Sequence, residues 1–251
     1  MTTLLKQELL GALRTYRLAI MIFVLLVVGL ISPLLARYTP LILEKVPDLP
    51  PDISELVPEP SVQEAVTQYI KNMSQLGVLL VIVINMGLVA GEKERGTLVM
   101  LLTRPVRPTS IVLAKWVAGM VSLLAGVLCA GAGCALYTVL LFGEFDLAAF
   151  VGLNALMLLF LAVYLTLSLL SSALAPTQVL AAAGAFGMLV VLLILGSLPR
   201  VGEFLPGELL SWGGRIFTPP AESAWAALLI SVSLIVLALV SACFALERQE
   251  L

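Results

Sequence analysis

The sequence predicts an all-α integral membrane protein with six transmembrane helices, an N-terminal amphipathic helix in the membrane interface and a short cytoplasmic helix. Hydrophobic residues make up 61% of the 251 residues and charged residues only 12%, with a mean hydropathy of +1.10. Such values are typical of a chain surrounded mostly by lipid. The apolar residues are also grouped into segments near the length of about 20 residues that crosses a bilayer as a helix. We therefore expect one transmembrane domain over residues 1–251.

Residues 1–17 form the first predicted element, an amphipathic helix lying in the membrane interface. Its apolar residues recur at helical spacing and form one face, and the polar residues Lys6, Gln7 and Arg14 are turned away from that face. This pattern is typical of interfacial helices. A simple cytoplasmic extension of the first span is the alternative. The apolar face consists of Leu5, Leu9, Ala12, Leu13 and Tyr16.

Hydropathy predicts six spans, with boundaries accurate to several residues. The second apolar run is short, but Ser61 and Glu64 have the spacing of a capping box. Its helix is therefore expected to begin outside the membrane and to run into it. The six spans are residues 18–36, 76–90, 116–142, 148–174, 179–198 and 223–246.

The segments between the spans predict the orientation. Residues 37–75 form a large outer loop, rich in proline and acidic residues in its first half, and residues 199–222 form an outer re-entrant element of short helices. An even number of spans places both termini on one side. If that side is cytoplasmic, it carries nine of the 14 Lys and Arg residues, which agrees with the positive-inside rule. Both termini are therefore expected in the cytoplasm.

Missing residue types exclude several kinds of chemistry. The chain has no histidine, so serine–histidine catalysis and the common zinc sites are excluded, and its three cysteines lie in predicted spans. It has no phosphate-binding loop for ATP. No acidic or basic residue lies well inside a predicted span, which disfavours a carrier driven by ions or protons. We expect no metal or cofactor in this chain, no nucleic-acid partner, and membrane lipid around it.

Residues 91–115 form a cytoplasmic connector that carries the most informative motif. The four consecutive charges of Glu92–Arg95 would cost about 10 kcal/mol or more inside the bilayer, so they are expected in the cytosol. Gly96 interrupts the helix, Thr97 can cap a new one, and prolines 105 and 108 end it. Such a charged, leucine-faced helix is typical of a docking element; a helix resting on the membrane surface is the alternative. Its apolar stripe is Leu98, Leu101 and Leu102.

At these residues the chain resembles the ATP-binding-cassette (ABC) type 2 permeases. The connector of that family typically reads Glu-x-Glu-x-Gly-Thr, followed by Leu-Leu, Pro-Val and a later Lys. The resemblance covers the whole layout of spans, and it departs at Arg107-Pro108, where many relatives carry Ser-Arg, which affects the local turn. The matching residues, in order, are Glu92, Glu94, Gly96, Thr97, Leu101, Leu102, Pro105, Val106 and Lys115.

The resemblance implies a transport subunit that is not itself an enzyme. It would pair with a second permease copy or a similar permease and bind two cytoplasmic ABC ATPase subunits, which hold ATP and Mg. The helix over residues 97–103 would be the coupling helix. The implied ATPase-coupling residues are Glu92, Glu94, Arg95, Gly96, Thr97, Leu98, Leu101 and Leu102.

The resemblance also implies a central cavity between two permease copies, lined by the second and fifth spans. The residues expected there are Asn85, Met86, Phe186 and Met188. Alternating access of this cavity would export a substrate across the plasma (inner) membrane of a prokaryote, and a mostly apolar cavity favours a hydrophobic or amphipathic cargo. The alternatives are an ATP-independent channel or scaffold and a membrane-embedded enzyme, the latter needing intramembrane acids or histidines.

Overall fold

The computed structural model describes residues 2–43, 60–97, 108–143, 145–217 and 223–248, and within these ranges every regular element is helical. Six helical stretches are long and apolar enough to cross a membrane, which confirms the predicted fold class. These stretches are Arg17–Thr39, Val62–Glu94, Pro108–Phe142, Leu147–Leu174, Gln178–Gly196 and Trp225–Glu247.

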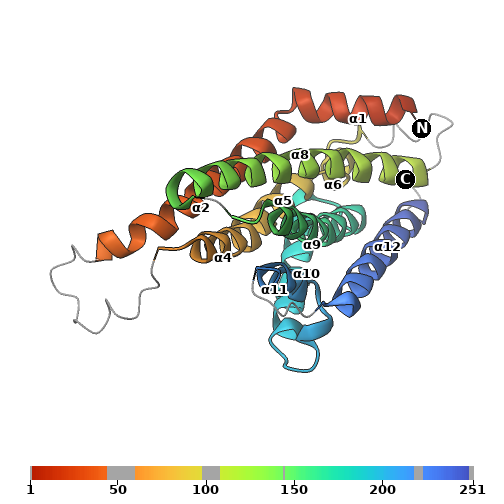
Figure 1. Ribbon diagram of the computed structural model, residues 1–251. Coiled ribbons are helices and arrows are strands. Elements are labelled where there is room, and N and C mark those ends of the chain that lie inside the picture. The colour runs from red at the N-terminus through yellow and green to blue at the C-terminus, as the bar shows by residue number, and fades with distance from the viewer. Residues whose placement is uncertain (1, 44–59, 98–107, 144, 218–222, 249–251) are drawn as a thin grey trace.

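The chain begins with two helices that meet at a bend. Helix α1 covers Thr2–Arg14 and α2 covers Arg17–Leu43, and between them Tyr16 has a φ of 58°. This left-handed conformation is uncommon for a residue with a Cβ atom, and it turns the chain sharply. Helix α1 is therefore a separate helix and not a straight continuation of the first span (Figure 1).

The second span is assembled from several shorter helices. It runs through α4 (Val62–Asn72), a π-helical turn η1 (Met73–Gly77) and α5 (Val78–Asn85), and α6 (Ala90–Glu94) follows after a break. At its start the Ser61 side chain accepts a hydrogen bond from the backbone N–H of Glu64 at 3.2 Å, which confirms the predicted N-cap.

Helix α9 lies at the centre of the bundle. It contacts α5, α8, α10, α11 and α12 and supplies a large part of the buried apolar core, whereas α1 and α2 pack on α8. Figure 1 shows this central position. The elements of this part of the chain are α8 (Pro108–Phe142), α9 (Leu147–Leu174), α10 (Gln178–Gly196), the 3₁₀ turn η2 (Gly202–Phe204), α11 (Pro206–Arg215) and α12 (Trp225–Glu247).

Several helices extend beyond the predicted spans. Helix α2 continues to Leu43, and α8 begins at Pro108 instead of residue 116. Helix α4 begins within the segment 37–75, as the capping box at Ser61 predicts. Hydropathy ends a span at its first polar residues, whereas backbone hydrogen bonding continues through them. Helices η2 and α11 fall in the outer element predicted at 199–222; residues 44–59, 98–107 and 218–222 lie outside the described residues.

Both ends of the chain lie at the same end of the bundle. In α12, Leu246 clusters with Val112 near the start of α8 and with Ala173 near the end of α9. In α1, Glu8 forms a salt bridge with Lys115 near the start of α8. This arrangement, visible in Figure 1, agrees with the even number of spans.

Close packing of α2 on α8 depends on Gly29. A Cβ atom at Gly29 would lie 2.2 Å from the backbone carbonyl oxygen of Ala130. Because a backbone atom cannot rotate away, Gly29→Ala is expected to lower the free energy of unfolding by about 2 kcal/mol. The control is Gly207→Ala in α11, where a Cβ would have no neighbour within 4 Å among the described residues. Unfolding of both variants in detergent measures the difference, and equal stabilities would contradict this packing.

Candidate functional site

The helix of the second span is interrupted between α5 and α6. One serine of α9 forms hydrogen bonds with the backbone groups that the interruption leaves without helical partners. The Ser172 hydroxyl oxygen accepts hydrogen bonds from the backbone N–H groups of Val89 at 3.0 Å and Ala90 at 2.9 Å. The same hydroxyl donates to the carbonyl oxygen of Met86 at 2.7 Å. A break inside a membrane helix needs such partners, because no water is available to satisfy the freed groups. Ser172 thus holds the bend after Asn85 in a defined shape.

The charged residues of α6 each reach a different helix. Glu92 accepts a hydrogen bond from Lys115 of α8 at 2.6 Å, and Glu94 accepts one at 3.2 Å from the backbone N–H of Gln178, the first residue of α10. Lys93 donates to the carbonyl oxygens of Ala173 and Ala175 at the end of α9. A cation at a helix C-terminus and an anion at a helix N-terminus both complement the helix dipole. The short helix α6 therefore connects α8, α9 and α10.

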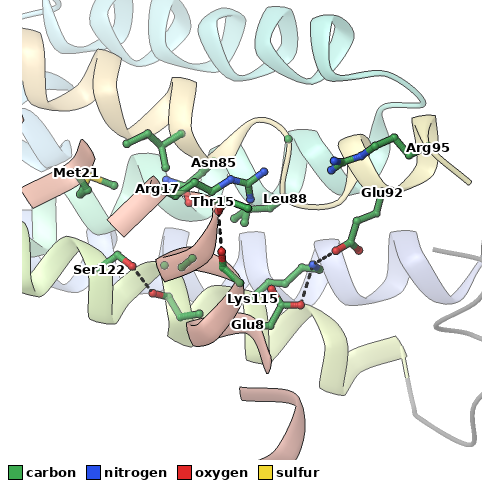
Figure 2. Close-up of a pocket in the computed structure, with 16 residues that line it drawn as sticks. Glu8, Thr15, Arg17, Met21, Asn85, Leu88, Glu92, Arg95, Lys115 and Ser122 are labelled. Carbon is green, nitrogen blue, oxygen red and sulfur yellow. Dashed lines mark hydrogen bonds and ion pairs between the residues drawn. The ribbon is translucent and has the colours of Figure 1, made fainter. Parts of the chain in front are cut away.

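Lys115 is the centre of a buried ion-pair cluster. Its side chain is 1% exposed, and its Nζ lies 2.9 Å from Glu8 Oε1 of α1 and 2.6 Å from Glu92 Oε1 of α6. Both glutamate side chains are 21% exposed. Glu92 Oε2 is buried and has no hydrogen-bond partner among the described residues. Figure 2 shows Lys115 between the two carboxylates, linking helix α1 to the connector.

A cavity of about 160 Å³ adjoins this cluster. Its wall combines the three charged residues with the bend between α1 and α2, the end of α5 and the first turns of α8 (Figure 2). The cavity therefore lies where the three elements linked by Lys115 meet. Its lining includes Glu8, Thr15, Arg17, Met21, Asn85, Leu88, Glu92, Arg95, Lys115 and Ser122.

The structure revises the expected surroundings of the connector charges. Glu94 and Arg95 are exposed as predicted, but Glu92 and Lys93 are half-buried because each charge is paired with a group on another helix. Lys115 lies inside α8, not in a connector ending at residue 115. It is thus a buried charge near the start of a helix that is apolar enough to span a membrane.

The remaining predicted coupling residues lie at the edge of the described chain. Gly96 has a φ of +69°, the conformation for which glycine is favoured, and Thr97 donates its hydroxyl to the carbonyl oxygen of Glu92 at 3.2 Å. Leu98, Leu101 and Leu102 fall outside the described residues, as does most of the helix predicted over residues 97–103.

The four residues predicted to line a transport cavity occupy different environments within one chain. Asn85 is buried and lines the cavity beside Lys115. Met86 packs against the small cluster of Ala90, Ala175 and Ala181, and Phe186 packs against the main core. Met188 is half-buried. A shared cavity between two copies stays a prediction.

Two residues of this site, Glu8 and Gln178, escaped the sequence analysis, because neither carried a distinguishing pattern. Ser172 is a polar residue inside a predicted span, but the sequence does not indicate which backbone groups it bonds. The one available signal was Lys115, whose place at the end of the connector motif indicated a role without indicating a partner. The partners lie far away in sequence, with 107 positions between Lys115 and Glu8 and 83 between Ser172 and Val89.

Comparison with known proteins agrees with this architecture. A family described as ABC-2 family transporter protein matches residues 2–207. The chain is also similar to the uncharacterized transmembrane protein YxlG of Bacillus subtilis (strain 168), with 30% identity over 216 residues, covering 83% of this chain and 81% of that protein. The connector motif, the six spans and this match lead to one conclusion: the chain belongs to the ABC-2 family of transporter membrane proteins.

Proposed function

We propose that this protein is the permease subunit of an ATP-driven exporter in the plasma membrane of a prokaryote, with both termini in the cytoplasm. It pairs with a second permease copy or a similar permease and binds two cytoplasmic ABC ATPase subunits, which bind and hydrolyse ATP with Mg. The observation that supports this most directly is α6, whose charges connect it to α8, α9 and α10 and, through Lys115, to α1.

In this proposal the connector transmits movement of the ATPases to the spans. A push on the segment after Gly96 moves α6, and the hydrogen bonds and ion pairs of α6 carry that movement to the helices that they join. Moving a two-state equilibrium from 1:99 to 99:1 requires about 5.5 kcal/mol of differential binding. Closure of two ATPase subunits around ATP would supply this, and the break at Met86–Val89 would let α6 move relative to α5.

Pairing of two permease copies is supported by the exposure of α10. This helix is the least buried of the six spans described, and it presents small side chains at Ala183 and Gly187 beside exposed large apolar residues. Small residues allow close approach of helices in membranes. A cavity between the two copies would then lie against α10, the helix that carries Phe186 and Met188.

A second cavity supports an apolar or amphipathic cargo. It has a volume of about 580 Å³ and lies between η1, α9, α10 and α11. That size falls within the roughly 300–1,000 Å³ of cavities that enclose small-molecule ligands. Its lining is mostly apolar, with polar groups from Ser74, Gln75, Tyr164, Glu208 and Ser211.

The proposal predicts that the variant Glu94→Ala with Gly96→Pro stays folded but is uncoupled from ATP hydrolysis. The first change removes the hydrogen bond to the start of α10, and proline cannot adopt the φ of +69° found at Gly96. The measurement is purification of the tagged protein in mild detergent, with mass spectrometry of copurifying proteins and a vanadate-sensitive ATP hydrolysis assay.

The control is Glu247→Ala, which removes an exposed acid at the same end of the bundle. We expect an ATPase to copurify with the natural protein and with the control, and substrate-stimulated hydrolysis to fall at least tenfold in the double variant only. Full stimulated hydrolysis by the double variant would contradict the role of the connector. A protein that purifies alone and inert, after controls for detergent dissociation, would favour an ATP-independent channel or scaffold.

A further inference from the structure

We propose that the cavity beside Lys115 binds the phosphate group of an anionic phospholipid from the leaflet in which α1 lies. The phosphate is held between the side chains of Arg17, the first residue of α2, and Arg95, which follows α6. This site shares Glu92 and Arg95 with the connector but lies apart from the cargo cavity. Lipid binding there does not depend on ATP-driven transport.

The charges around the cavity favour an anion. Three cations, Arg17, Arg95 and Lys115, face two carboxylates, so the lining carries one excess positive charge. Lys115 is bonded to both carboxylates, Glu8 and Glu92. Lys115 thus forms an ion pair with one oxygen of each glutamate. The excess positive charge of the cavity therefore comes from the two arginines.

The two arginines lack a charged partner of their own. Arg17 forms no salt bridge or hydrogen bond with the residues that the structure describes. Arg95 acts on it as a like charge, and Glu8 and Glu92 act on it as opposite charges. Arg95 donates its Nε to the carbonyl oxygen of Gly91, which leaves the end of its guanidinium for other acceptors. Figure 2 shows both guanidinium groups at the cavity. An anion between them would relieve their repulsion and accept their hydrogen bonds.

The position of the cavity indicates a lipid as the source of this anion. The cavity is lined by Gly11, Ala12 and Thr15 of the α1–α2 bend and by Met21 in the first turns of the first span. Nearby, Leu10, Leu13 and Tyr16 expose 42%, 54% and 70% of their surface, as expected of a helix in contact with lipid. Lipid phosphates lie at this level, and basic pockets between spans on the cytoplasmic side bind lipid head groups.

The size of the cavity favours a small group. Its volume of about 160 Å³ accommodates a phosphate. Cavities that enclose drug-sized ligands measure roughly 300–1,000 Å³, so a whole nucleotide would not fit. The lipid tails would remain outside, along the exposed apolar face of α1 and the start of α2.

The test measures lipid binding by the purified, delipidated full-length protein. Phosphatidylglycerol, phosphatidylcholine or inorganic phosphate is added in mild detergent, and bound lipid is counted by native mass spectrometry while thermal unfolding is followed in parallel. We expect phosphatidylglycerol to bind and to raise the unfolding temperature more than either of the other two. Because no ATPase is needed, failure here leaves the proposed transport function untouched.

Matched variants locate the site. Arg17→Gln and Arg95→Gln are each expected to weaken phosphatidylglycerol binding by about fivefold to tenfold, the loss of roughly one basic contact. Arg14→Gln removes an exposed arginine of α1 that does not line the cavity, and it should change binding less than twofold. If Arg17→Gln does not fold, Arg95→Gln, on a separate element, still tests the site.

Three results would overturn the proposal. Equal weakening by Arg14→Gln and Arg17→Gln would mean general attraction to a basic surface. Unchanged phosphatidylglycerol binding by Arg95→Gln would show that Arg95 does not bind the phosphate. If inorganic phosphate raises the unfolding temperature as much as phosphatidylglycerol does, and if this effect requires Arg17, the site binds free anions and not a lipid.

Discussion

Replacing Lys115 with methionine is expected to lower the free energy of unfolding by about 3 kcal/mol and to abolish coupling. The substitution keeps an unbranched apolar chain but leaves the carboxylates of Glu8 and Glu92 facing each other without their shared cation. Removing one partner of a buried ion pair costs about 3–5 kcal/mol. We expect the lower end of that range because both glutamates are 21% exposed and retain some contact with water.

The control for Lys115→Met is the triple variant that adds Glu8→Gln and Glu92→Gln. With no charge left unpaired, most of the lost stability should return, since replacing a buried ion pair completely is often nearly neutral. Unfolding is followed in detergent by titration with sodium dodecyl sulfate, and ATP hydrolysis is measured with the copurified ATPase. If the cluster transmits movement, the triple variant will be stable yet uncoupled. If the triple variant recovers coupling, the cluster has a purely structural role. If it does not recover stability, the unpaired carboxylates are not the cause of the lost stability.

Replacing Ser172 with alanine is expected to lower the free energy of unfolding by about 2 to 3 kcal/mol. It removes the hydroxyl that now bonds three backbone groups: the buried N–H groups of Val89 and Ala90 and the half-buried carbonyl of Met86. Each buried group left unsatisfied costs about 1 kcal/mol or more. The loss should be local, because these bonds hold the break between α5 and α6.

The matched control for this change is Ser231→Ala in α12. Ser231 is equally buried, but its hydroxyl bonds only the carbonyl oxygen of Ala227 in its own helix, so its loss should cost less than about 1 kcal/mol. Hydrogen exchange measured by mass spectrometry gives a local reading: amides near Val89 and Ala90 should exchange faster in Ser172→Ala and remain unchanged in Ser231→Ala. Unchanged exchange at the break in both variants would rule out Ser172 as its support.

The helices were predictable because hydropathy and capping are properties of short segments. Ser61 caps α4 as its spacing with Glu64 predicts, and the six predicted apolar runs lie in the six helical stretches of the structure. The ends of the helices were less predictable. Hydropathy detects where a long apolar run stops. The first turns of α8, where Thr109, Ser110 and Lys115 interrupt the apolar residues, still belong to the helix because backbone hydrogen bonds are independent of side-chain polarity.

The candidate site was predictable only in part. The exposed position of Glu94 and the special backbone of Gly96 follow from local composition, and both were expected. The burial of Glu92 was not expected, because the cost of burying a charge depends on whether a partner is near. That partner, Lys115, reaches Glu92 only once the fold has brought α6 near the start of α8.

By itself, the sequence determined three properties of the protein. Hydropathy determined the number of spans, the even number of spans placed both termini at one end, and a contiguous motif indicated the family. Only the tertiary structure decided which groups meet: Lys115 with Glu8 and Glu92, and Ser172 with the broken backbone at Val89. Such pairs depend on how whole helices pack. A hydrogen bond requires atoms to approach within about 3 Å, and residues many positions apart reach that distance only when the fold brings them together.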